Sequence, residues 1–185
     1  MSRLTRTIAV VALLSLVAGV FADGIEFRRV ALTLSDDDTI LLDAESTFDL
    51  NDTVAEALEN GVPLTFETHV QMRRDDAWVW ESDVIDLRLR TLLQYRPLSG
   101  LYELRDLQGQ GRLSFATRDA ALRTLGRIVG MPVVRRERLD LDQDYLVRLR
   151  IGLDIESLPL PMRPTAYLSR DWRLSSDVWE WRLRP

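Results

Sequence analysis

The sequence predicts a mainly β fold, an antiparallel β-sandwich with two short helices. Three segments, 64–73, 85–95 and 145–155, alternate apolar and polar residues with the two-residue period of a half-buried strand. Turn-forming residues follow some of these segments, as at 97–100 and 108–111, and this punctuation favours hairpins and antiparallel pairing. The alternative is an α+β fold, in which one antiparallel sheet carries both helices on one face.

The first predicted strand changes phase in its middle. Ile25 and Phe27 occupy odd positions, whereas Val30 and Leu32 occupy even positions. An extra residue in one strand of an antiparallel pair shifts the alternation in this way. We therefore expect a β-bulge at 28–29.

Helices are predicted at 53–60 and 117–129, where apolar residues recur at helical spacing. Asn51 or Asp52 can cap the first helix, and Gly130 ends the second. Each helix is followed by a Gly-x-Pro sequence and an apolar strand. An internal duplication of a strand–helix–strand unit is therefore left open.

Residues 1–22 have the pattern of a secretory signal peptide. Arg3 and Arg6 precede an apolar run at 8–21 that closes on small residues. The run is shorter than the roughly 20 residues that cross a bilayer as a helix. We expect cleavage after Ala22 and a periplasmic location, with no transmembrane segment after cleavage.

The remaining residues, 23–185, are enough for a single β-rich domain. The chain has 24 basic and 29 acidic residues and a formal net charge of −5, which argues against nucleic acid as a partner. It contains no cysteine, so disulfides and thiolate metal sites are excluded. We expect neither a metal nor a cofactor.

No catalytic residue is predicted. His69 is the only histidine and falls on the polar face of its strand, and the chain has no Gly-x-Ser-x-Gly sequence, so a hydrolytic triad is not expected. Residues 140–144 have the opening spacing of a calcium loop. Tyr145 stands where that loop needs glycine and Ile151 where it needs glutamate, so we interpret the segment as a polar turn.

Binding residues are predicted in two kinds of segment. Tryptophans two residues apart share one face of a strand, where adjacent indoles could contact a sugar ring or a protein partner. Three prolines at 159–164 exclude a central strand and favour polyproline II, a form that is preordered for docking. The candidate residues are Trp78, Trp80, Trp179, Trp181, Pro159, Pro161, Arg163 and Pro164. The alternatives are core packing for the tryptophans and a plain crossover for the proline segment.

Four arginines lie on the polar faces of the predicted strands: Arg88, Arg90, Arg148 and Arg150. They could bind phosphate or carboxylate groups of a lipid or of the cell wall. Because the chain is acidic overall, we expect them instead to pair with acidic neighbours on a solvated sheet.

Several stretches carry a family resemblance. They are LNDTVAEALENGVPLTF at 50–66, YRPLS at 95–99, DIESLPLP at 154–161 followed by Arg163 and Pro164, and Asp171 with Trp172. Together they resemble a proteobacterial family, the domain of unknown function numbered 4390, also labelled "proline-rich signal peptide protein". The family has no assigned chemistry, so the resemblance implies no catalytic residue. Genes of the family often lie next to one for a sensor histidine kinase, which implies by association a role in envelope sensing.

These observations predict a non-enzymatic binding or accessory protein of the cell envelope, whose partner is an envelope protein or a cell-wall component. The alternative is a carboxylate-based hydrolase acting on a cell-wall glycan, which needs two acids about 5 to 9 Å apart in a cleft. A deep pocket with two buried carboxylates would favour the hydrolase. A shallow apolar groove would favour the binding protein.

Overall fold

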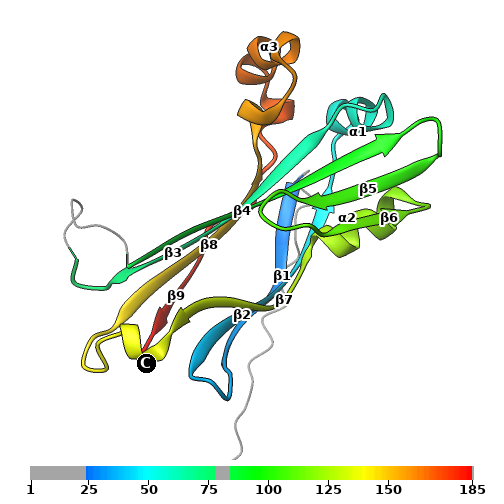
Figure 1. Ribbon diagram of the computed structural model, residues 1–185. Helices are drawn as coiled ribbons and strands as arrows, with labels where there is room; N and C mark the ends of the chain where they lie inside the picture. Colours follow the sequence, from blue (N-terminus) through cyan, green and yellow to red (C-terminus); the bar gives the residue numbers. More distant parts are fainter. Residues whose placement is uncertain (1–23, 78–83, 185) are drawn as a thin grey trace, which may run out of the picture.

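Two antiparallel sheets and three short helices make up the computed structural model, which describes residues 24–77 and 84–184 (Figure 1). Sheet A has the strand order β1 (Gly24–Leu34), β2 (Thr39–Asp49), β7 (Arg127–Arg135). Sheet B has the order β6 (Arg112–Phe115), β5 (Leu101–Asp106), β4 (Ile85–Arg96), β3 (Leu64–Arg74), β8 (Tyr145–Leu153), β9 (Trp179–Leu183). The helices are α1 (Asp52–Glu59), α2 (Arg118–Leu125) and α3 (Arg163–Leu168). The predicted mainly β, antiparallel fold is confirmed.

The two sheets enclose the core between their inner faces. On β3 the alternate residues Val70 and Met72 are fully buried, and they pack with Leu42 of β2 and Val147 of β8. A second cluster lies toward the helices, where Leu58 of α1 packs with inner residues of β3 and β4. The residues of β3 and its neighbours that alternate with these buried ones lie on the outer face of sheet B, as the alternation predicted.

Local predictions near the amino-terminal end of the domain are confirmed. The register between β1 and β2 changes between Phe27 and Arg29, which is the expected bulge. Asn51 is the N-cap of α1, because its side chain accepts a hydrogen bond from the Val54 N–H at 3.0 Å. Both features depend on neighbours in the sequence, so the sequence alone reveals them.

The predicted extent of the second helix is wrong. Helix α2 ends at Leu125, and Ile128, which falls within the predicted helix at 117–129, lies on β7 opposite Ala44 of β2. The helix stops because Gly126 sits against the backbone of Ser46, whose N–H donates to the Gly126 carbonyl at 2.8 Å. Gly130, expected to end the helix, has a φ of +59° within β7.

The proline segment differs in form from the expected polyproline II. Its residues belong to the connection from β8 to β9 and fold into short 3₁₀ turns (Ile155–Ser157, Leu160–Met162, Arg170–Trp172) around α3. Pro161 and Pro164 each fall in the first turn of a helical element, where a missing N–H costs nothing. The prediction that these prolines exclude a central strand is confirmed. The alternative of a crossover between sheets is wrong, because the segment connects β8 and β9, which are antiparallel neighbours in sheet B. Strand β8 correspondingly ends at Leu153, before the predicted end at 155.

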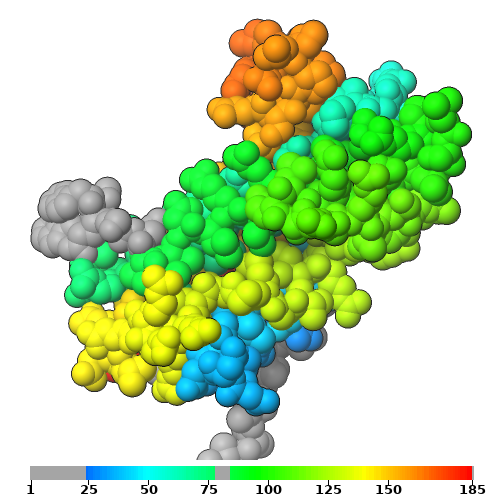
Figure 2. All heavy atoms as spheres, in the orientation of Figure 1, coloured from blue at the N-terminus to red at the C-terminus, as the bar shows by residue number. Residues whose placement is uncertain are grey.

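The connection that carries α3 projects from the sheets as a separate lobe (Figures 1 and 2). It is anchored at its base by Trp172, which is buried in the helical cluster, and by the Asn51 side-chain amide, which donates to the Asp171 carbonyl at 2.7 Å. Among the described helices, none is long and apolar enough to cross a membrane.

Candidate functional site

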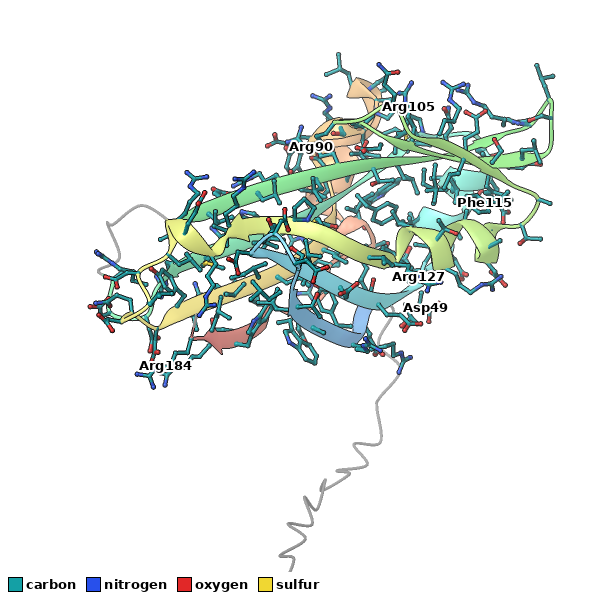
Figure 3. All side chains as sticks on the ribbon, turned by 60° about the horizontal axis from the view of Figure 1, so that its bottom comes forward. Asp49, Arg90, Arg105, Phe115, Arg127 and Arg184 are labelled. Carbon is teal, nitrogen blue, oxygen red and sulfur yellow. The ribbon has the colours of Figure 1, made fainter. Side chains whose placement is uncertain are left out.

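A hollow of about 650 Å³ lies on the outer face of sheet B, at the base of the α3 lobe. Its floor is formed by polar side chains of the three central strands, β3, β4 and β8. Its walls are residues 152–156 and 173–175, the two ends of the connection that carries α3. Figure 3 shows Arg90, a floor residue, on sheet B beside that lobe, whereas Asp49 and Arg127 lie on sheet A.

The strand register places basic side chains in a row across the floor. His69 of β3 stands opposite Arg88 of β4 on one side and opposite Arg150 of β8 on the other. The next outward residue of β3, Glu67, stands between Arg90 and Gly152. All of these residues line the hollow, because outward positions on adjacent antiparallel strands lie side by side.

The wall at 173–175 reaches the floor through a close contact with Gly152. Gly152 and Ser175 form a bridge, and the Leu153 N–H donates to the Leu174 carbonyl at 2.8 Å. A Cβ at position 152 would lie 3.3 Å from the Ser175 Cβ, which is tighter than ordinary contact. The glycine thus lets this segment approach β8 and bring Arg173 to the hollow.

The carboxylates that line the floor are paired with arginines. Glu67 lies 3.0 Å from Nε of Arg90 and 3.5 Å from Nη1 of Arg88, and Asp154 lies 3.9 Å from the same Arg90 Nε. The hydrogen bond with Glu67 is the main cause that holds the pKa of Arg90 above its ordinary value, and the negative charge of Asp154 is the second. Glu67 and Asp154 are therefore both close to one guanidinium, which remains charged.

His69 is on the polar face, as predicted, and has an acidic partner. Its Nε2 lies 2.7 Å from Oδ1 of Asp86, the residue two positions before Arg88 on β4. The hydrogen bond with His69 is the main cause that lowers the pKa of Asp86 below its ordinary value. The pair fixes the imidazole at the middle of the basic row.

Two arginines of the hollow lack a carboxylate partner within the described residues. Arg150 Nη2 donates to the Ser175 hydroxyl at 3.1 Å, and the Arg173 guanidinium has no ion pair there. By contrast, Arg148, two residues before Arg150, pairs with Glu180 of β9 at 2.6 Å. The expected pairing with acidic neighbours is confirmed for three of the four predicted arginines, Arg150 being the exception.

The carboxyl-terminal tryptophans lie on the other face of sheet B. Trp179 and Trp181 on β9 stand opposite Leu149 and Val147, whose side chains are buried in the core. Trp181 is half-buried against that cluster. Trp179 is 41% exposed, with its ring edge-to-face on Phe27 at 6.2 Å.

The other predicted binding residues are not brought together with this pair. Trp78 and Trp80 lie outside the described residues. Pro161 and Pro164 are exposed and Pro159 is half-buried, and they belong to the α3 lobe, whereas β9 lies toward the other end of the molecule (Figure 1). Arg163 is engaged locally, because its Nε donates to the Leu158 carbonyl at 2.8 Å.

The aspartate-rich segment at 140–144 is a turn that leads into β8. Its structure is closed by the Asp140 N–H, which donates to the hydroxyl of Tyr145 at 2.8 Å, and the Tyr145 side chain is buried in the core. Within 24–77 and 84–184, no group of three or more histidine and acidic side chains is placed to hold a metal ion.

The chain belongs to the family of the domain of unknown function DUF4390, whose model matches residues 22–182. The family predicted from the sequence motifs is thereby confirmed. Comparison with curated proteins and with solved structures found no match to the chain.

Proposed function

We propose that this protein is a non-enzymatic binding module of the bacterial cell envelope and that the hollow on sheet B is its ligand face. The observation that carries the proposal is the composition of the hollow. Four arginines and the only histidine meet there, and two of the arginines have no carboxylate partner among the described residues. Charged side chains that converge in a concave surface are typical of a binding site.

The envelope setting rests on the sequence. A leader with the pattern of a signal peptide precedes the domain, and the sequence motifs resemble a family whose genes often lie next to one for a sensor histidine kinase. The ligand of the module is then an envelope protein or a cell-wall component.

The hydrolase alternative is favoured by one feature, the proximity of Glu67 and Asp154 to the same guanidinium of Arg90. A glycan hydrolase needs one carboxyl group that keeps its proton near neutral pH, which apolar surroundings provide. The surroundings of these two carboxylates are guanidinium groups in an open hollow. The site is neither the deep acidic pocket nor the shallow apolar groove that the sequence led us to compare, and its chemistry suits binding better than hydrolysis.

Co-sedimentation with purified cell-wall sacculi and with envelope vesicles tests the proposal, with protein purified after expression of the full chain. We expect the protein to sediment with one of these fractions and to release no soluble fragments from it. The charge reversal Arg150→Glu should abolish sedimentation, whereas Arg148→Glu, outside the hollow, should not. Release of soluble glycan fragments by the wild type would support the hydrolase instead.

A further inference from the structure

We infer that the hollow on sheet B binds a phosphate ester, with Arg150 and Arg173 holding the phosphate. The inference rests on the proposed function, since it names the ligand of the same face. It depends on three properties of the hollow: which cations are available, how many acceptor atoms they need, and how large the space is.

The available cations come from two separate parts of the chain. Arg150 stands in the basic row of the floor, and Arg173 comes from the wall that Gly152 admits to the edge of β8. Within the described residues neither guanidinium has a carboxylate partner, whereas Arg88 and Arg90 are both paired with Glu67. An anion that enters the hollow therefore meets two cations that need not give up an existing ion pair.

Two guanidinium groups with free donors favour phosphate over carboxylate. Each guanidinium presents several N–H donors in a rigid fork, and a carboxylate offers two acceptor oxygens and a single negative charge, whereas a phosphate monoester carries nearly two at neutral pH. A phosphate ester offers more acceptor oxygens and can bridge two forks. The Ser175 hydroxyl, which accepts from Arg150, can donate its own hydrogen to a further oxygen.

The size of the hollow indicates that the phosphate is attached to a larger body. A volume of about 650 Å³ falls within the range of small-molecule sites and exceeds what an isolated ion fills. The wall residues Asp154 and Glu156 also line the hollow, with carboxylates that accept hydrogen bonds from hydroxyl groups. A phosphate carried on a polyhydroxy body, such as glycerol or a sugar, matches both the unpaired arginines and these carboxylates.

Isothermal titration calorimetry with glycerol 3-phosphate at neutral pH and low salt is the direct test. We expect saturable binding by the wild type and a loss of about tenfold to a hundredfold in affinity for Arg150→Gln and for Arg173→Gln, as for hydrogen bonds to a charged group. The matched control is Arg148→Gln, two residues away on the same strand face but paired with Glu180. Its affinity should stay within about twofold of the wild type.

Two further arms distinguish the chemistry and the source of the ligand. Glycerate, which replaces the phosphate by a carboxylate, should bind more weakly than glycerol 3-phosphate. Phosphatidylcholine vesicles with and without phosphatidylglycerol separate a lipid headgroup from a soluble ester. Binding that requires phosphatidylglycerol and Arg150 identifies the lipid source, and binding of glycerol 3-phosphate alone identifies a soluble one.

Failure of the inference is distinguishable from failure of the proposed function. If neither glycerol 3-phosphate nor phosphatidylglycerol vesicles bind, or if Arg148→Gln weakens binding as much as Arg150→Gln, the phosphate inference is overturned. Sedimentation with envelope fractions that still depends on Arg150 would then leave the binding face in place with another ligand. Sedimentation that is indifferent to Arg150 would overturn the binding face as well.

Discussion

The contact between Gly126 and Ser46 predicts that Gly126→Ala destabilises the domain. Without a steric conflict this change would be favourable by up to about 1 kcal/mol, because Gly126 has an ordinary φ of −75° that alanine adopts and alanine lowers the conformational entropy of the unfolded chain. A Cβ at this position would lie 2.1 Å from the Ser46 carbonyl oxygen, below any contact that real Cβ atoms make. The end of α2 and β2 must therefore separate.

The cost follows from the hydrogen bonds that the separation breaks. The Gly126 carbonyl accepts from the Ser46 N–H at 2.8 Å and from the Ser46 hydroxyl at 3.2 Å, and Ser46 is only 5% exposed. A buried donor that loses its partner costs about 1 to 3 kcal/mol. Two such losses cost about 2 to 6 kcal/mol, and the gain of up to about 1 kcal/mol from replacing glycine leaves a net destabilisation of about 1 to 5 kcal/mol.

Urea denaturation followed by tryptophan fluorescence measures this difference in unfolding free energy. The matched control is Gly111→Ala, since position 111 has no positive φ and its added Cβ would meet only the Asp106 Cβ, at an ordinary 3.8 Å. We expect the control to change stability by less than about 1 kcal/mol. A Gly126→Ala variant as stable as this control would refute the packing described for the end of α2 against β2.

Further predictions concern β9, the His69 pair and the leader. Trp181→Ala should lower the unfolding free energy by about 2 to 3 kcal/mol, because the Trp181 ring covers the core cluster. Trp179→Ala should lower it by only about 1 kcal/mol, because the Trp179 side chain is 41% exposed. Equal denaturation midpoints for the two variants would contradict this order. Asp86, whose folded pKa is lowered below 3.8 by His69, stabilises the fold above about pH 4 and loses this effect as pH falls through its folded pKa. The difference in stability between the wild type and Asp86→Asn, measured by melting at several pH values, should accordingly become smaller in acid. A difference that grows in acid would refute the stabilising pair of Asp86 with His69. Intact mass of periplasmic protein should correspond to a chain starting at Asp23, and retention of Met1 would show that the leader is not removed.

Some features follow from the sequence because short-range physics decides them. The alternation in β3 places Glu67 and His69 outward whatever lies beyond the strand, and the Asn51 cap needs only the helix that it begins. The predicted end of α2 is wrong because Gly126, the residue that stops the helix, is held by hydrogen bonds from Ser46, which is 80 positions earlier in the chain. The helical periodicity of a sequence carries no information about a contact between residues so far apart in the chain.

The arginines of the hollow likewise could not be distinguished from other outward arginines by sequence alone. Arg148 and Arg150 occupy equivalent outward positions on β8 and cannot be told apart by pattern. Their neighbours differ because β9 supplies Glu180 beside Arg148, whereas the bridge at Gly152 supplies Ser175 beside Arg150. The outward arginines of β4 and β8 were recognisable in the sequence, but Arg173 and the walls of the hollow depend on the fold.

Mapping backbone NMR shifts during a titration with glycerol 3-phosphate tests most directly whether the hollow on sheet B is the ligand face. We expect saturable shifts concentrated in residues 67–69, 88–90, 150–156 and 173–175, which form the floor and walls. Shifts centred on Trp179 of β9 or on the α3 lobe, with the floor unaffected, would contradict it.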